Sequence, residues 1–433
     1  FNSHLKATQT ISSTGGVLEF NPGLAFVDST VYYWRVAPVP ATGQPVWNDA
    51  SFLFKINSSS GFNQSHYYQH KASEVSRMKL ERDGWKFDTV QNILMVYNGV
   101  WASAITQEAA LSITVNNLSY IRSICNFGLV FNVFDKKSFK PWKNQVVGSG
   151  GLYQSLSPGC ASSRIWNFEY SNDSSGRRKA REFLQQVPDG NMVIMRVTVL
   201  NGSTVQFVDK WMADTTVYGP GNTLYHALKG QGVTVLDSFT SLKAVSMIFS
   251  KNNPAFNTAQ IITRGIFDAI SLPATFQTAD SVGTITSPVI GPARTWRSLR
   301  LQARGDDPAD SASVQLVGVT PNGSSIVLFD GISAQLTSFD ISSISAIQYP
   351  FLQLRMRTKD VSSFTPFQLD GWQVLYDPVP EGALSPTQYF QFADTADVGQ
   401  PQAFKIAFQN VSNVPFDSVR VKLQVTDRQN IVH

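Results

Sequence analysis

The sequence predicts a mainly β, multi-domain protein built from β-sandwiches, with one α/β domain inserted among them. Three observations lead to this prediction. The 433 residues correspond to about three or four domains. Most of the chain consists of short segments in which apolar and polar residues alternate, which is typical of antiparallel strands. Residues 121–253 interrupt this pattern with longer apolar runs and two segments of helical periodicity.

The interruption predicts a compact α/β domain. Residues 127–134 (FGLVFNVF) are almost continuously apolar, as expected of a strand covered on both faces. Residues 177–187 (RRKAREFLQQV) place apolar side chains at i, i+3, i+4 and i+7. Asp173, Ser174 or Ser175 can cap the start of this helix. We expect the charged run of the helix to face solvent. A strand, a helix and a strand follow at residues 191–199, 222–232 and 244–249.

The segments on both sides of this domain predict one β-sandwich that the domain splits. Residues 84–118 contain three short strands, and residues 299–377 contain five. In residues 352–357, leucine and methionine alternate with glutamine and arginine, the pattern of a half-buried strand. Insertions at loop tips are well tolerated. We therefore expect residues 77–120 and 254–378 to form the host sandwich and residues 121–253 the inserted domain.

The two ends of the chain predict incomplete domains. Residues 32–38 (YYWRVAP), followed by a tryptophan and the strand at 46–56, resemble the last strands of a fibronectin type III domain, here at residues 1–57. Because this domain lacks its first strands and the chain does not begin with methionine, we expect a fragment, a mature product or the ordered part of a longer protein.

A polar linker is expected at residues 58–76, and an Ig-like domain is expected to begin in residues 379–433. In the second segment, four apolar residues alternate with polar ones and are expected on the inner face of a strand: Val419, Val421, Leu423 and Val425.

The charge of the chain excludes two kinds of partner. Lysine and arginine number 35 against 31 acidic residues, so the net charge is +4, and charged residues make up only 15% of the chain. This excess is too small and too dispersed to indicate binding to nucleic acid or to a membrane surface. No stretch approaches the roughly 18 apolar residues of a membrane span. Low charge combined with many hydroxyl and amide side chains favours an exported β protein.

Cys125 and Cys160 are a candidate disulfide. An even pair of cysteines in an exported protein favours a disulfide, with two free thiols as the alternative. A catalytic cysteine needs a base within hydrogen-bonding reach, and neither local sequence (RSICNFG or SPGCASS) contains a known nucleophile motif. We therefore assign no catalytic residue to this chain.

Two groups of residues are candidate metal ligands. Asp306, Asp307 and Asp310 share one loop and can supply carboxylate oxygens to calcium, although acids beside a proline also form ordinary turns. Calcium is the one cofactor that the sequence suggests. His66 and His70 have the i, i+4 spacing that can hold zinc on a helix. The neighbouring tyrosine pair favours extended chain instead, so we expect these histidines to lie in a linker or to pack against other residues.

Aromatic side chains in the predicted loops of the α/β domain are candidate contacts for a carbohydrate or a protein partner. Exposed tryptophan and tyrosine rings stack on sugar faces, and partial burial in the domain is the alternative. The candidates are Trp142, Trp166, Trp211 and Tyr218.

The α/β segment resembles the interleukin-like epithelial–mesenchymal transition inducer (ILEI) domain. The resemblance rests on an opening strand that ends in VFD, on FLQQVPDGNMVIM at residues 183–195, and on a helix before a last apolar strand. It implies a compact non-catalytic domain. Sugar binding is known for one domain of this fold, but the basic residues it uses, which would fall near Leu242 and at 123–126, are not reproduced here.

Further strings extend a resemblance over nearly the whole chain: YYWRVAP, GFNQSHYYQH, AISLPATF, SPVIGPARTW, YPFLQLR and DGWQVLYDPVPEGAL. The chain is similar to the non-catalytic C-terminal half of gingipain-type (PorU-like) sortase homologues of the type IX secretion system of Bacteroidota. The resemblance implies the cell surface of a Gram-negative bacterium, association with the outer membrane through partners, and contacts with translocon or cargo proteins. It also implies a cysteine peptidase domain upstream.

We therefore expect an exported, non-catalytic region that mediates protein–protein contacts beside the type IX machinery. Two alternatives remain: a carbohydrate-binding surface adhesin module, and an accessory part of an active sortase-like peptidase whose catalytic domain lies upstream of Phe1.

Overall fold

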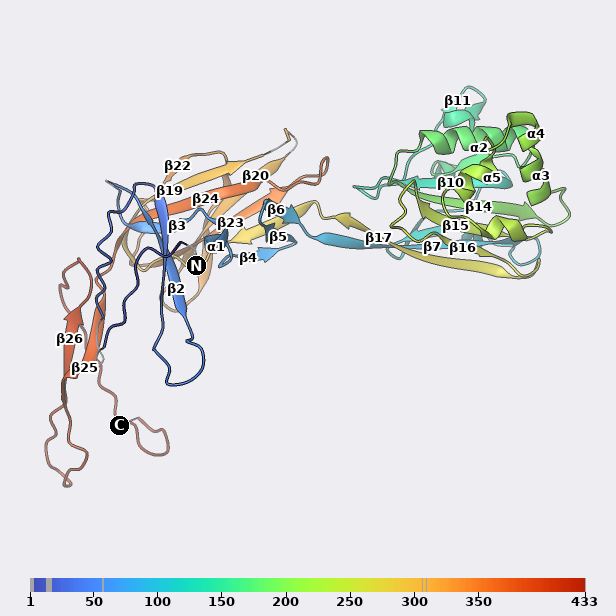
Figure 1. Ribbon diagram of the computed structural model, residues 1–433. Coiled ribbons are helices and arrows are strands. Elements are labelled where there is room, and N and C mark those ends of the chain that lie inside the picture. The colour runs from blue at the N-terminus through green and yellow to red at the C-terminus, as the bar shows by residue number, and fades with distance from the viewer. Residues whose placement is uncertain (1–3, 13–17, 57, 306, 309, 433) are drawn as a thin grey trace. The chain divides into compact units, whose positions relative to one another are not determined.

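The computed structural model describes residues 4–12, 18–56, 58–305, 307–308 and 310–432. The chain forms two compact units (Figure 1). The first, here called the α/β unit, consists of Phe87–Ser281 and Asp360–Thr365. The second, here called the β unit, consists of Phe1–Lys86, Val282–Lys359 and Pro366–His433. The expectation of a mainly β chain with several separate sheets is confirmed.

One nine-stranded sheet organises the α/β unit, in the order β13-β10-β14-β7-β8-β9, with β15 beside β14, β16 beside β15, and β17 beside β7. All neighbouring strands are antiparallel except β14 and β7. The strands are β7 (Thr89–Trp101), β8 (Ile113–Val115), β9 (Leu118–Ile121), β10 (Gly128–Phe134), β13 (Phe168–Tyr170), β14 (Met192–Leu200), β15 (Val245–Ser250), β16 (Ala259–Ile262) and β17 (Ala269–Ala279).

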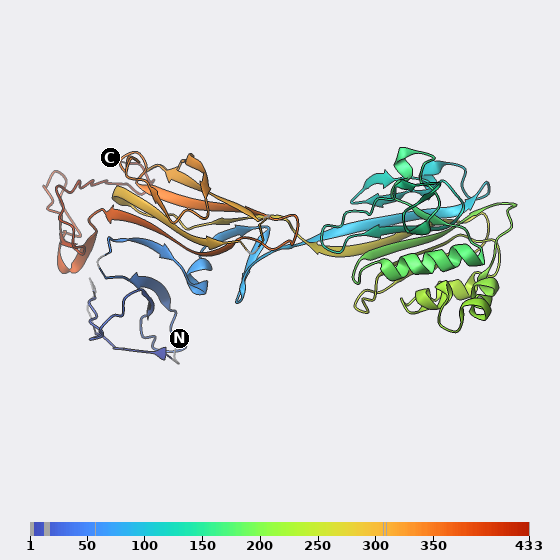
Figure 2. The same cartoon turned by 90° about the horizontal axis from the view of Figure 1, so that it is seen from above.

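Helices cover one face of this sheet (Figures 1 and 2). They are α2 (Ser174–Gln186), α3 (Val208–Ala213), α4 (Thr215–Tyr218) and α5 (Leu224–Lys229). Short 3-10 helices lie at Glu108–Leu111, Leu152–Gln154, Ser162–Arg164 and Val235–Ser238. Of the three predicted capping residues, Asp173 caps α2: its Oδ1 accepts a hydrogen bond of 2.8 Å from the Gly176 N–H.

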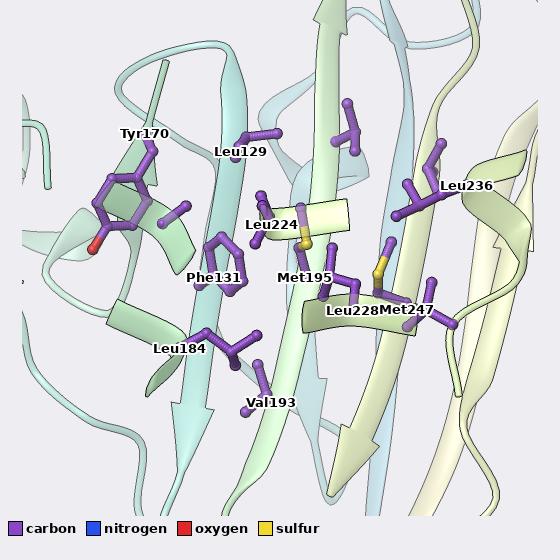
Figure 3. Packing of buried hydrophobic residues seen from close by; sticks show 14 of the residues in the cluster. Leu129, Phe131, Tyr170, Leu184, Val193, Met195, Leu224, Leu228, Leu236 and Met247 are labelled. Carbon is purple, nitrogen blue, oxygen red and sulfur yellow. The ribbon is translucent and has the colours of Figure 1, made fainter. Parts of the chain in front are cut away.

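Strand β14 separates two apolar cores, because successive side chains of a strand point to opposite faces. Val193 and Met195 pack with β10, β15 and the helices (Figure 3). Met192 and Ile194 pack instead with apolar residues of β7, β8 and β17. The strands of this one sheet therefore lie in two layers, one around β14 and one around β7. The helices form the third layer.

The β unit contains two larger sheets. The five-stranded sheet has the order β21-β20-β23-β18-β4, and the four-stranded sheet has the order β22-β19-β24-β3. Their strands are β3 (Gly61–Gln64), β4 (Glu74–Ser76), β18 (Val282–Thr286), β19 (Ala293–Arg304), β20 (Ser311–Val319), β21 (Ser325–Ser333), β22 (Ser338–Asp340), β23 (Phe351–Lys359) and β24 (Gln368–Pro378). Leu352, Leu354 and Met356 of β23 are buried, as their alternation predicts.

Smaller elements complete the described chain. The two-stranded ribbons are β1 (Thr30–Val36) with β2 (Asn48–Phe54), β5 (Met78–Glu81) with β6 (Gly84–Phe87), β11 (Val146–Val147) with β12 (Gly150–Gly151), and β25 (Gly382–Gln391) with β26 (Lys405–Asn410). A single helical turn, α1, spans Tyr67–His70.

The boundaries of the two units differ from the domain boundaries that the sequence predicts. Strands β7, β8, β16 and β17, expected in the host sandwich, belong to the α/β unit. Strands β7 and β23, expected to share one core, belong to different units. The cause is long-range packing: Leu94 and Val96 of β7 pack against Ile194 of β14, a contact that no local pattern reports.

Two expectations for smaller segments are also corrected. The linker expected at 58–76 contains β3 and β4, which pair with β24 and β18 and so are integral strands. The strand expected around residues 419–425 does not form, and its four apolar side chains are exposed. Among the described residues no neighbouring strand pairs with this segment, and an unpaired strand is not stable.

Candidate binding site beside the disulfide

The structure joins Cys125 and Cys160 in a disulfide. Cys125 lies between β9 and β10, and Cys160 lies in the loop between β12 and β13. Their Cα atoms are 5.8 Å apart, and 35 residues separate them in the chain. The bond ties the long loop after β10 to the entry of that strand.

A buried carboxylate supports the Cys125 side of this bond. Glu169 on β13 accepts hydrogen bonds from the backbone N–H groups of Cys125 (2.8 Å) and Asn126 (2.7 Å). Burial raises the pKa of the Glu169 carboxyl above its ordinary value, and these hydrogen bonds act in the opposite direction. Arg196 of β14 is also fully buried, and burial lowers the pKa of its guanidinium to about 10.

Asn144 orders the Cys160 side. Its side-chain amide donates to Ser155 Oγ (3.0 Å) and to the Asn167 carbonyl (2.9 Å). Its Oδ1 accepts from the backbone N–H groups of Gln145 (2.9 Å) and Leu152 (2.8 Å). Because Asn144 is buried and all its hydrogen-bonding capacity is used, it holds three loop segments in one arrangement.

These supports surround a pocket of about 480 Å³. It is lined by Lys143, Asn144, Gln145, Val146, Pro158, Gly159, Ala161, Ser162 and Ile165. Val146 and its neighbour Val147 form β11, and each is 53% exposed. Among the described lining residues, Lys143 is the one with a charged side chain, and its charge is positive. The site therefore combines an ordered polar wall, one cation and an exposed aliphatic rim.

The predicted aromatic contacts are distributed unevenly around this site. Trp142 and Trp166 adjoin the lining residues Lys143 and Ile165 in the chain. The Lys143 ammonium lies 5.2 Å from the centre of the Trp166 ring. Trp142 stacks on Tyr153, with ring centres 6.0 Å apart.

The other two aromatic candidates, Trp211 and Tyr218, are not among the residues that line this pocket. Trp211 is fully buried in the helix-side core, and its indole N–H donates to the Gln206 carbonyl at 3.1 Å, so its predicted ligand contact is wrong. The half-buried Tyr218 shares a hydrogen bond with Ser174 Oγ (3.3 Å) at the start of α2.

The aspartate loop belongs to the β unit. Asp306 lies outside the described residues. The Asp307 N–H donates to Asp310 Oδ2 at 3.1 Å, and the Asp310 N–H donates to the Asp307 carbonyl at 2.9 Å. This geometry is that of a turn. Among the described residues no three His, Cys, Asp or Glu side chains are grouped as metal ligands.

The extended chain that the sequence predicts around the two histidines is found only at His66, and His70 is the last residue of the helical turn α1. The tyrosine pair that favoured extension forms this turn itself. His70 is buried edge-on against Trp85, with ring centres 5.6 Å apart, and burial lowers its pKa to about 4.

The expectation that the charged run of α2 faces solvent is wrong for Arg177. It is buried, and its Nε and Nη2 donate to the two carboxylate oxygens of Asp214 at 2.6 and 2.9 Å. Its Nη1 donates to the Asn172 carbonyl and to Gln206 Oε1, both at 2.8 Å. Arg177 thus connects α2 to α3 and α4.

Sequence reasoning missed Lys143, Asn144, Val146 and Val147. A signal for the rim was present, because two valines followed by GSGG at residues 148–151 predict a short hairpin with apolar side chains. Nothing in the sequence marks Asn144, whose role depends on partners up to 23 residues away.

Comparison with known proteins adds no relative. No protein-family model matches the chain, and no curated protein matches it. In the described part of the chain, no helix is both long and apolar enough to span a membrane.

Proposed function

We propose that this chain is an exported, non-catalytic recognition region whose α/β unit binds protein partners at the pocket beside the disulfide. The observation that carries the proposal is the exposed pair Val146–Val147 at the rim of a pocket whose walls are held by the disulfide and Asn144. An aliphatic patch exposed on an ordered support is typical of protein interaction sites.

The surroundings of the pocket favour a protein over a glycan. Sugar binding by stacking requires open ring faces. One face of Trp142 is covered by Tyr153, the Trp166 ring is beneath Lys143, and Trp211 is buried. The two valines, in contrast, present aliphatic surface, which a sugar with its many hydroxyl groups matches poorly.

The geometry also defines the chemistry of the partner. We infer an extended segment that places an aliphatic side chain in the pocket and a carboxylate near Lys143 Nζ. The short ribbon β11–β12 exposes backbone groups to which such a segment can pair. The carboxylate would add a charge-assisted hydrogen bond to the contact.

The resemblances carry the wider assignment. We propose an ILEI-like domain within the α/β unit, fibronectin- and Ig-like sandwich domains within the β unit, and PorU-like kinship for the whole chain. On this basis the partners are translocon or cargo proteins of the type IX machinery at the cell surface, and outer-membrane association occurs through them. Any peptidase activity would reside upstream of these residues.

Crosslinking and affinity purification from the native membrane test this function. The unmodified chain should recover translocon or cargo proteins, and the variant Val146→Asp/Val147→Asp should lose them. Val217→Asp is the matched control, because Val217 is a 69% exposed valine on α4 of the same unit. Recovery of no such proteins, or the same set with the double variant, contradicts the proposal. A glycan array with both variants tests the adhesin alternative.

A further inference from the structure

A second pocket lies in the β unit, on the five-stranded sheet. Its volume is about 380 Å³. It is lined by Arg77, Val282, Gly283, Thr284, Ser311, Ala312, Ser313, Arg357, Thr358 and Lys359. Three of these described residues are cationic and none is acidic. The acidic residues Glu74, on β4, and Asp310, next to β20, are not among them.

The strand pattern of β23 provides two of the cations. Met356 and Thr358 are buried, whereas Arg357 and Lys359 point outward and are exposed. Because successive side chains of a strand point to opposite faces, the side chains of these two residues stand on the same face. Residues two apart on a strand are about 7 Å apart. Two positive charges at this separation repel each other, and a shared anion relieves that repulsion.

Small neighbours keep these cations accessible. Arg357 pairs across the sheet with Ser313 of β20 and Thr284 of β18. Lys359 pairs with Ser311 and Val282 in the same way. Since none of these four side chains is long, they form the floor of a trough beside the two charged groups. The hydroxyl groups of Ser313 and Thr284 add hydrogen-bond donors to this floor.

The third cation reaches the pocket from the edge of the sheet. Ser76 of β4 pairs with Thr284, and Arg77 follows it with a left-handed φ of 61°. The next residue, Met78, packs into space that only a glycine leaves open: a Cβ at Gly283 would lie 1.9 Å from Met78 Cγ. This packing fixes the turn between β4 and β5 and holds Arg77 at the pocket.

We propose that this pocket binds the phosphate monoester group of a larger ligand. Two guanidinium groups and one ammonium match a doubly charged tetrahedral oxyanion in charge, and a guanidinium fork can bind two phosphate oxygens at once. Hydroxyl donors on the floor reach a remaining oxygen. The ligand is a phosphorylated sugar or a lipid with a monoester headgroup, because both present this group at an exposed end.

Isothermal titration of the whole chain at low salt tests the site, with three probes: inorganic phosphate, glucose 6-phosphate, and phosphatidylcholine vesicles containing phosphatidic acid. We expect saturable binding that weakens as salt increases. In Arg357→Gln/Lys359→Gln, we expect affinity to fall by about tenfold or more, since two charge-assisted hydrogen bonds are lost. Tighter binding of glucose 6-phosphate identifies a sugar ligand, and tighter binding of the vesicles identifies a lipid.

Two control variants make the result decisive. Arg300→Gln removes an exposed arginine of β19 in the four-stranded sheet and should leave binding unchanged. Lys359→Arg retains the charge and should retain binding. The proposal is overturned if none of the three probes binds saturably, if the double variant binds as well as the unmodified chain, or if Arg300→Gln weakens binding equally.

Discussion

Strand β10 and residues 419–425 have similar apolar content, but β10 is buried and the apolar side chains of 419–425 are exposed. All seven residues of β10 are buried between its neighbours β13 and β14 and beneath α2. The apolar residues at 419–425 form no strand, and Leu423 among them is 65% exposed. The comparison teaches that an apolar pattern predicts a tendency to be buried, while the available neighbours decide whether burial occurs.

The aromatic ribbon β1–β2 lies between these extremes. Its strands pair along their whole length, from Thr30 opposite Phe54 to Val36 opposite Asn48. Phe26 and Tyr32 pack edge to face at 4.9 Å, and Tyr32 stacks on Phe52 at 5.5 Å. Trp34 nevertheless remains 49% exposed. Pairing with one neighbour alone orders a ribbon without burying its side chains.

The comparison predicts the largest effect for a buried charge in the α/β unit. In Arg177→Ala, Asp214 loses its partner and stays buried, so unfolding of this unit should become about 3–5 kcal/mol easier. Urea titration followed by helical circular dichroism measures the change. The matched control is Arg178→Ala, whose partner Glu182 is half-buried and whose loss should cost about 0.5 kcal/mol or less. Equal effects of the two variants would contradict the role assigned to Arg177.

The second effect concerns the disulfide. Replacing both Cys125 and Cys160 by serine releases a 35-residue loop, which should cost the α/β unit about 3–4 kcal/mol by loop-closure entropy. Hydrogen exchange followed by mass spectrometry should show faster exchange at residues 143–165, with no change at residues 405–410. Uniform acceleration over the whole chain would show that the bond does not act locally.

The third effect is specific to the β unit and depends on pH. The pKa of His70 falls from 6.5 to about 4 on folding, so the unfolded chain takes up a proton first. The free energy of unfolding is therefore unaffected by the titration of His70 above pH 6.5. It decreases as the pH falls from 6.5 toward 4, by about 3 kcal/mol at most. Urea titrations followed by tryptophan fluorescence between pH 4 and 7 measure this loss.

A substitution separates His70 from the carboxylates that titrate in the same range. His70→Phe keeps a ring against Trp85 and Trp372 but cannot take up a proton. We expect this substitution to flatten the pH dependence of stability, because the contribution of His70 to it is removed. An unaltered slope in His70→Phe would assign the pH effect to other groups.

The smallest effect is expected where the chain is least buried. Leu423→Ala should change stability by less than about 0.5 kcal/mol, because its side chain is already in water. The same substitution at Leu129 of β10, which is fully buried, should cost about 2–5 kcal/mol. Urea titration of both variants measures the difference, and comparable losses would show that residues 419–425 pack in solution.

Much of the α/β unit could be predicted from the sequence. The strands at 127–134 and 191–199 and the helix at 177–187 were placed within a few residues, because each has the periodicity of its element over enough length to be unambiguous. Helices α3 and α4 were missed, since six and four residues are too few for a helical pattern to be recognised. The candidate site was predicted only at its margins, through Cys125 and Cys160 and through two tryptophans.

The sequence by itself determined local properties of this protein: the strands at residues 127–134 and 191–199, the helix at 177–187, and the mainly β character of the chain. The tertiary structure decided the assembly. It placed β7 and β17 with β14, turned Arg177 inward to meet Asp214, and buried Trp211. The physical reason is distance along the chain. Periodicity reflects neighbours within a few residues, whereas Val199 pairs with Val100 across 99 residues, and only packing in three dimensions selects that partner.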